Sequence, residues 1–499
     1  MNQTLRLLAA CLLLSACASP HLSDKPVVYE TYCGNCHIAP EPEHLSAKLW
    51  EEHVLPEMGA RLGIREAGYN PFKDLTYEER AVMVANRTYP EKPLLSQKNW
   101  ESIKAFVLKN APEVLPDTVD RISRNQALKQ FTPHPIALDG RKGAMISFLQ
   151  ARTKEKGMLA GIVQGHLWNW TPEGSVWDLQ EGRAAIVGYH QTDDDTLILS
   201  MGQMTPTEVA SGRLVQRGQS TPVVASLHRP VQLLQQDLNG DGSEEIIIAE
   251  FGNHKGQLRM IADGKEKVLL PFPGIVRVVP QDMNGDGKDD LVVMASQGDE
   301  GIFVLYQGDN LQFSGEKVLR FHAIHGSSWF ELMDFDGDGD QDLAVVNGDN
   351  ADYSSSLKPY HGFRIYLNQG DNQFAESYFH PLHGATRVIA RDFDQDGDTD
   401  FAIASFFPDF NDNPAEAFVY LNTLDTASFS FQSHTFPEAT RGRWMVMEPG
   451  DVDQDGDEDI VLGSFTFAPA PTPDKVIKSW REDNVDLIWL ENTKLHPDQ

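Results

Sequence analysis

A nine-residue acidic loop that occurs five times limits the possible folds of this chain more than any other feature. The copies begin at residues 237, 282, 334, 392 and 451, so their starts are 45 to 59 residues apart. A short run of aliphatic and β-branched residues follows each copy directly. Short strands at regular spacing predict a sandwich, barrel or propeller, and a repeated unit of this length favours the propeller.

The acids within each loop have the spacing of a calcium site. Calcium takes six to eight oxygen ligands, and acids at positions 1, 3 and 5 of a tight loop converge on one point. Glycine at position 6 allows a sharp turn, so that the carbonyl of position 7 and the carboxylate of position 9 can complete the ligand set. An EF-hand is excluded because a strand follows each loop instead of a helix. We predict up to five Ca²⁺ ions, with ligands from Asp237, Asn239, Asp241, Glu245, Asp282, Asn284, Asp286, Asp290, Asp334, Asp336, Asp338, Asp342, Asp392, Asp394, Asp396, Asp400, Asp451, Asp453, Asp455 and Asp459.

The loops resemble the FG-GAP or VCBS repeat, which is found in the propeller of integrin α-chains. The resemblance implies that each repeat forms one four-stranded blade and that the ion braces the turn between its first two strands. At the mean spacing of the loops, residues 133–499 correspond to an all-β propeller of seven blades, with six or eight as alternatives. The two blades without a full loop are expected near 140–185 and 186–230, and Asp193-Asp194-Asp195 in the second is a degraded copy.

Cys33-Gly34-Asn35-Cys36-His37 has the sequence of a c-type haem attachment site. Two thiols on one helical turn can each bond a haem vinyl group, and the adjacent His37 then supplies the proximal ligand of the iron. A redox C-x-x-C would need a βαβ setting, and a zinc site would need further ligands nearby. We therefore predict one covalent haem c, held by Cys33, Cys36 and His37.

Met58 is the predicted sixth ligand of the haem iron. A proline precedes it and glycines follow it, which suits a loop that lays a thioether against a haem. The alternatives are Met83, a histidine (His44 or His53), and an open site.

Residues 27–115 are expected to form a small all-α cytochrome c domain ahead of the propeller. Apolar residues recur at helical spacing in 45–54, 77–85 and 100–108. Pro56 is expected to end the first of these helices, and Thr76 to begin the second with a capping box. Through its haem motif and final helix, the domain loosely resembles class I cytochrome c. Residues 116–132 are predicted to be a polar linker.

The N-terminus has the pattern of a secretory signal, with Arg6 followed by an apolar stretch from Leu7 to Leu14. Leu14-Ser15-Ala16-Cys17 resembles a bacterial lipobox. The resemblance implies cleavage between Ala16 and Cys17 and acylation of Cys17. An ordinary secretory signal is the alternative. Residues 18–26 form a short tether. The resemblance implies an outer-membrane lipoprotein on the periplasmic or cell-surface side, since Ala18 and not Asp follows Cys17.

The formal net charge is −31 at pH 7. This excess of acid argues against nucleic acid or an anionic membrane surface as a partner, because both attract basic patches. No long acidic tail accounts for it, so bound cations are the better explanation. Membrane attachment is therefore predicted through the lipid alone.

Three long connections on the face opposite the calcium loops are the predicted partner face, with Tyr360, His361 and Trp480 as its candidate residues. Arg443 could join them, and loops that merely cover the central channel are the alternative. The leading hypothesis is electron transfer with a redox partner protein or a carbohydrate-like substrate docked on the propeller. A second is a propeller enzyme, a dehydrogenase or lyase, that uses the haem as an electron outlet. Adhesion or scaffolding is the third.

Overall fold

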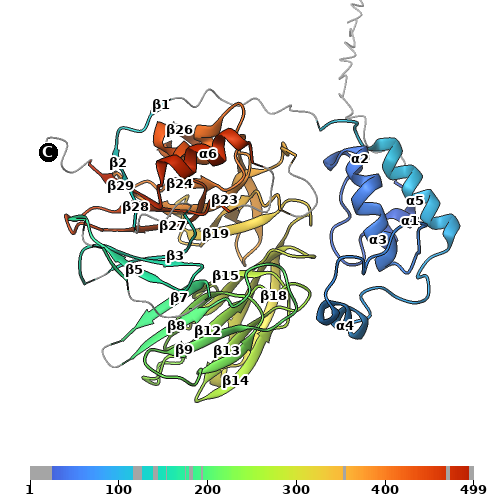
Figure 1. Cartoon of the computed structure of the whole chain (residues 1–499), viewed down its shortest axis with the longest axis horizontal. Coiled ribbons are helices and arrows are strands. Elements are labelled where there is room, and N and C mark those ends of the chain that lie inside the picture. The colour runs from blue at the N-terminus through green and yellow to red at the C-terminus, as the bar shows by residue number, and fades with distance from the viewer. Residues whose placement is uncertain are drawn as a thin grey trace, which may run out of the picture.

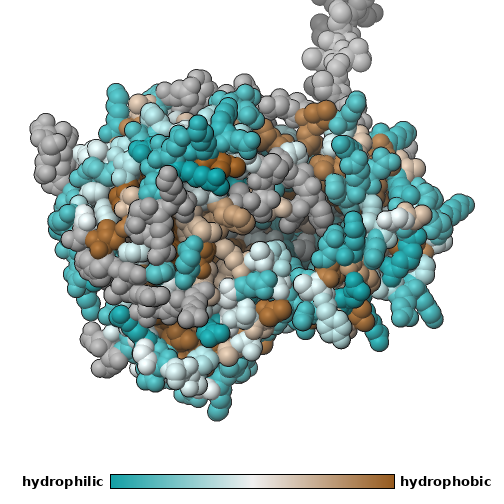
Figure 2. Space-filling view, viewed as in Figure 1, coloured by the Kyte–Doolittle hydropathy of each residue, from teal (hydrophilic) through white to brown (hydrophobic). Residues whose placement is uncertain are grey.

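The structure is a computed structural model, which describes residues 25–115, 126–138, 144–152, 154–174, 176–178, 184–192, 195–351, 356–467 and 472–493. A small N-terminal helical unit lies beside a β-propeller made of seven sheets (Figure 1). On the face shown in Figure 2, the surface of the helical unit is mostly hydrophilic. No helix among the described residues is long and apolar enough to cross a membrane. Cys17 lies outside the described residues, so its lipidation stays a prediction.

The N-terminal unit is only partly helical, whereas the sequence predicted an all-α domain. Tyr29 of the first helix packs against Phe106 of the last, with ring centroids 5.0 Å apart. Apolar side chains from both helices and the segment between them form one buried core. The helices are α1 (Val27–Cys33), η1 (Pro42–His44), α2 (Ala47–Leu49), the π-helical turn η2 (Trp50–Val54), α3 (Leu55–Arg61), α4 (Tyr77–Ala85) and α5 (Gln97–Asn110).

The sequence predicted that Pro56 would end the first long helix, and this prediction is wrong. The helix continues to Arg61, because a π-helical turn precedes the proline and Leu55 N–H donates to the carbonyl of Trp50. Pro56 therefore stands at the second position of α3, directly after the π-helical turn. The capping box of α4 is confirmed, since the Thr76 side chain accepts from Glu79 N–H and the Glu79 side chain accepts from Thr76 N–H.

The seven sheets follow one another along the chain, and the first strands of neighbouring sheets pack together around the axis. Seven blades, as predicted, are therefore present. The first blade consists of β3 (Ile146–Ala151), β4 (Met158–Ile162), β5 (Leu167–Trp170) and β6 (Val176–Asp178). The second consists of β7 (Ile186–Gln191), β8 (Thr196–Ser200), β9 (Gly212–Gln216) and β10 (Val224–Leu227). The third consists of β11 (Pro230–Gln236), β12 (Glu245–Glu250), β13 (Gln257–Ala262) and β14 (Lys265–Leu270).

The last four blades each begin with a strand that runs into a complete acidic loop. In the third blade, the acidic loop that begins at residue 237 joins β11 and β12. All five acidic loops therefore join the first and second strands of their blades. These four blades are β15 (Ile275–Gln281), β16 (Asp290–Ala295), β17 (Gly301–Gln307) and β18 (Phe313–Arg320); β19 (Ser327–Met333), β20 (Asp342–Asn347), β21 (Gly362–Asn368) and β22 (Phe374–Pro381); β23 (Ala385–Arg391), β24 (Asp400–Ser405), β25 (Phe418–Asp425) and β26 (Ser430–Thr435); β27 (Trp444–Gly450), β28 (Asp459–Ser464) and β29 (Leu487–Asn492).

The ring is closed by a strand from the beginning of the propeller. β2 (Phe131–Ile136) pairs antiparallel with β29 and becomes the outer strand of the seventh blade. β1 (Gln126–Ala127) adds to the edge of the sixth blade beside β26. The propeller therefore starts at residue 126, within the segment predicted to be a linker, because closure needs a strand from outside the linear repeat. Shorter helices η3 (Asp309–Leu311), η4 (Pro414–Ala417), η5 (Pro437–Arg441) and α6 (Asp474–Asp483) lie in the connections.

Candidate metal and cofactor sites

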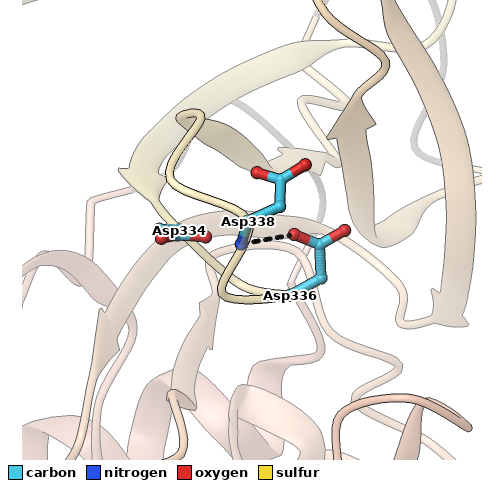
Figure 3. A group of neighbouring side chains, drawn as sticks. All are labelled: Asp334, Asp336 and Asp338. Atoms are coloured by element: carbon cyan, nitrogen blue, oxygen red, sulfur yellow. Dashed lines mark hydrogen bonds between the residues drawn. The ribbon is translucent and has the colours of Figure 1, made fainter.

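Each acidic loop turns back on itself through hydrogen bonds to its own first aspartate. In the third loop, Gly339 N–H donates to Asp334 Oδ2 at 3.1 Å, and Asp338 N–H donates to Asp336 Oδ1 at 3.3 Å. Figure 3 shows Asp334, Asp336 and Asp338 around this tight turn. The glycine at position 6 has a positive φ, 95° at Gly339, which an L-residue adopts only with strain.

Three of the loops bring three carboxylates close enough for one ion. In each, the donor oxygens at positions 1, 3 and 5 lie within 4.8 Å of one another. The first two loops have Asn239 and Asn284 at position 3, so an amide oxygen replaces one carboxylate there. Among the described residues, the groups with three such acidic or histidine donors are Asp334, Asp336 and Asp338; Asp392, Asp394 and Asp396; and Asp451, Asp453 and Asp455.

The acid at position 9 has a structural role that the sequence did not reveal. These five carboxylates, of Glu245, Asp290, Asp342, Asp400 and Asp459, are between 0% and 3% exposed. Asp342, for example, accepts Phe335 N–H at 2.9 Å and Asn368 N–H at 2.8 Å, and so ties its loop to β21. Each oxygen keeps a second lone pair. Calcium ligation by position 9 therefore stays a prediction beside this backbone contact.

Several carboxylates of the fourth and fifth loops have raised pKa values. Burial raises the pKa of Asp459 to about 8 and that of Asp400 to about 7. Burial, followed by the charge of neighbouring aspartates, also raises the pKa of Asp396 and Asp453. A divalent cation in such a loop would offset the repulsion between these carboxylates. The hard oxygen donors of the loop fit calcium.

The C-x-x-C-H motif lies at the end of α1, against the core of the helical unit. Cys33 and Cys36 are both free thiols, Cys33 half-buried and Cys36 exposed. Burial raises the pKa of the Cys33 thiol to about 12. His37 Nδ1 lies 2.9 Å from the Ile38 carbonyl oxygen. A ring nitrogen held in this way leaves Nε2 available for a metal, which is the usual arrangement of a ligating histidine. These residues fit a covalently attached haem.

Met58 packs against the same apolar core as Cys33. It lies on α3 and not in a loop, because the helix continues past Pro56. Of the alternatives, Met83 is buried on α4 and His53 is exposed on the π-helical turn. His44 faces the propeller. Met58 and Cys33 thus share one cluster, and ligation of the iron by Met58 stays a prediction.

The helical unit docks onto the propeller through a histidine and tyrosine cluster. Tyr360 OH donates to the His44 carbonyl at 3.0 Å, and Ile38 forms a parallel bridge with His322. The His44 ring lies 5.1 Å from the ring of His322 and 6.1 Å from that of His325. Burial lowers the pKa of His44 to about 4 and that of His325 to about 2, so both rings are neutral. The haem motif is therefore held directly against the propeller.

The three candidate residues of the partner face are largely covered. Tyr360 lies beneath the helical unit, and His361 and Trp480 are each 2% exposed. Trp480 Nε1 donates to the Thr440 carbonyl at 3.0 Å, which ties α6 to η5 in the connection between the sixth and seventh blades. These side chains pack beneath the surface of the predicted partner face. Binding of a partner on this face stays a prediction.

Sequence reasoning did not find the contact between His44 and the pair His322 and His325. No signal in the sequence pairs them, because 278 residues separate His44 from His322. Among the described residues, this cluster does not bring three donor atoms within 4.8 Å, so it is not a preformed metal site.

Comparison with known proteins identifies the repeats. Residues 282–345 and 392–462, which contain the last four acidic loops, match the model of the FG-GAP-like repeat. The protein is thus a seven-bladed β-propeller with FG-GAP repeats. No curated protein matches the chain. Among solved structures, the chain is similar to the Pan2 WD40 domain of Neurospora crassa, with 10% sequence identity and a TM-score of 0.42 over 74% of this chain and 97% of that chain.

Proposed function

We propose that the protein is a membrane-anchored c-type cytochrome whose calcium-stabilised propeller docks a redox partner protein or a substrate. The haem, when bound, supplies a one-electron carrier. Cys33 and Cys36 would hold it covalently, and His37 and Met58 would supply ligands to its iron. Acylated Cys17 would anchor the protein to the outer membrane, on its periplasmic or cell-surface side.

The observation that carries this proposal is the setting of His37. Its Nδ1 is held by the Ile38 carbonyl, and the next residue along, Ile38, is bridged to His322 of the propeller. A rigid proximal histidine beside two free thiols and an apolar cluster is what covalent haem attachment needs. Because the motif lies at the junction of the two units, a molecule bound on this face of the propeller would be close to the electron carrier.

Covalent haem is tested by expression together with a cytochrome c maturation system. The protein should keep its haem through denaturing electrophoresis, and the double variant Cys33→Ala with Cys36→Ala should lose it. The exposed His53→Ala is a matched control on the same unit and should keep the haem. A colourless wild-type protein would refute the proposal.

Electron transfer is tested by following haem reduction in the purified protein. Reduction by other redox proteins alone favours a carrier, whereas reduction by a sugar or alcohol with formation of product favours a dehydrogenase. If neither reduces the haem, electron transfer as the function is refuted.

A further inference from the structure

A cavity of about 410 Å³ opens on the propeller face opposite the acidic loops. Its lining residues come from the connections between β20 and β21, β24 and β25, and β28 and β29, and Arg443 comes from the connection between β26 and β27. Its volume is in the range of small-molecule sites. The lining residues are Asn350, Leu357, Phe407, Pro408, Asp409, Phe410, Asn411, Arg443, Thr472 and Pro473.

Arg443 is the one cation that lines this cavity, and its charge is not paired by a carboxylate in the described part of the chain. The side chain is 1% exposed. Nε donates to the Phe406 carbonyl at 2.7 Å and Nη1 donates to Thr472 Oγ1 at 3.3 Å. Nη2 is buried and has no hydrogen-bond partner. The ring of Phe406 lies 4.0 Å from the guanidinium carbon and holds the group in place. A buried guanidinium with a free donor is costly without an anion.

A second residue of the cavity lining has an orphaned atom of the opposite hydrogen-bonding character. Asn350 is 6% exposed, and its amide nitrogen donates to the Ser356 carbonyl at 2.9 Å. Its Oδ1 is buried with no partner, so it lacks a donor. A molecule that satisfies both sites must present an anionic oxygen to Arg443 and a hydroxyl or amine to Asn350.

Asp409 limits the charge of that molecule. Its carboxylate lines the cavity and accepts the backbone N–H groups of Asn411 and Asp412 at 3.0 and 3.3 Å. One arginine and one aspartate in the same cavity suit a single negative charge better than the two charges of a phosphate monoester. The aspartate can also accept hydroxyl groups, while Phe407 and Phe410 offer apolar ring surfaces.

We propose that this cavity binds a small hydroxycarboxylate of monosaccharide size, such as a sugar acid, with its carboxylate on Arg443 and its hydroxyl groups on Asn350 and Asp409. The site depends on neither the haem nor the calcium loops. Failure of the proposed electron transfer would therefore leave this binding unchanged, and failure of binding would leave the haem spectrum unchanged.

The test is calorimetric titration of the full-length protein with D-glucuronate, its methyl ester, D-glucose and inorganic phosphate. Glucuronate should bind at least about tenfold more tightly than the ester and glucose, because the charge-assisted contact with Arg443 is lost in both. This comparison needs no variant, so it holds even if a changed Arg443 prevents folding. Equal binding of the ester, equal or tighter binding of phosphate, or no binding of glucuronate would each overturn the proposal.

Variants locate the site. Arg443→Gln and Asn350→Ala should each weaken glucuronate binding at least about tenfold. Arg481→Gln removes the same charge from an exposed position on α6, outside the cavity, and should leave the affinity unchanged. If Arg481→Gln weakens binding as much as Asn350→Ala does, general charge attraction explains the binding and the proposed site is refuted.

Discussion

Single side chains decide the chemistry at the haem motif. Cys33 and Met58 come from different helices, α1 and α3, and pack against one apolar core. Met83, on α4, is buried as well. Burial alone therefore does not distinguish the two methionines, whereas their position relative to Cys33 favours Met58.

In the haem-loaded protein, Met58→Ala should abolish the strongly shifted methyl resonance that an iron-bound methionine gives in the NMR spectrum. The reduction potential should fall, because a methionine ligand raises it. Met83→Leu should keep the resonance, since it alters only packing on α4. Loss of the resonance in Met83→Leu and not in Met58→Ala would show that the ligand is Met83.

A second residue-scale effect comes from charges that the first strands bring together near the propeller axis. Glu448 on β27 lies among charged residues of β15, β19 and β23. Burial raises its pKa to about 7, against the opposing effect of the nearby arginines. The folded protein thus holds a proton on Glu448 that the unfolded chain releases near pH 4.5. The charged groups that face it are Arg277, Glu331, Arg387 and Arg391.

The stability that this proton contributes is fully present below about pH 4.5 and is lost as the pH rises through about 7. Between about pH 5 and about pH 8, the free energy of unfolding of the wild type should therefore fall by about 1–2 kcal/mol more than that of Glu448→Gln. Urea unfolding at both pH values measures this difference. Parallel pH profiles for the two proteins would contradict the assignment.

At the scale of elements, each acidic loop is a hairpin between the first two strands of a blade, and its acids have two different tasks. Positions 1, 3 and 5 converge at the exposed turn, as Asp334, Asp336 and Asp338 do in the third loop. Position 9 is buried and pairs with backbone N–H groups of its own loop and, at Asp342, of β21. The turn is therefore the part of the loop in which we predict the ion.

Asp336→Ala should remove one calcium ion per molecule and lower the melting temperature, because an ion bound only by the folded state stabilises it by about 2.7 kcal/mol at a hundredfold excess over its Kd. Metal analysis of the dialysed protein and thermal unfolding with and without chelator measure both effects. Asp340→Ala is the matched control. It removes the same charge from position 7, where the backbone carbonyl is the expected ligand. Identical calcium content in all three proteins would refute a calcium site in this loop.

For the whole molecule, the main question is how the helical unit stays on the propeller. Ile324, in the connection between β18 and β19, packs against the core of the helical unit. The Tyr360 hydrogen bond and the bridge of Ile38 with His322 add polar contacts around it. The C-x-x-C-H motif is thus fixed in position by apolar burial, one side-chain to backbone hydrogen bond and one backbone bridge.

Ile324→Asp should separate the two units, because it places an unpaired charge in this apolar contact, at a cost of several kcal/mol. The radius of gyration from small-angle X-ray scattering should rise, while calcium content stays the same. Val268→Asp, on the exposed side of β14, is the matched control and should leave the radius unchanged. An unchanged radius in Ile324→Asp would show that other contacts hold the units together.

The sequence predicted a good part of this fold from local patterns. The strands after the loops and the α4 capping box are present, because turn and cap residues act within a few positions of one another. The seven blades are present as well, and they were predicted from the repeat spacing of the loops. The end of the first long helix at Pro56 was predicted wrongly. Trp50, at the start of the π-helical turn before the proline, is buried and its Nε1 donates to the Pro42 carbonyl at 2.9 Å, a contact that periodicity does not reveal.

By itself, the sequence determined the repeating hairpins, and it predicts the donor sets of the acidic loops and the haem attachment motif, since each lies within one short segment. Only the tertiary structure decided which distant segments meet. It brought β2 to β29 to close the ring, His44 to His322 at the junction, and Arg443 to Asn350 in one cavity. The physical reason is that these contacts come from burial of apolar surface between whole elements, which has no fixed spacing along the chain.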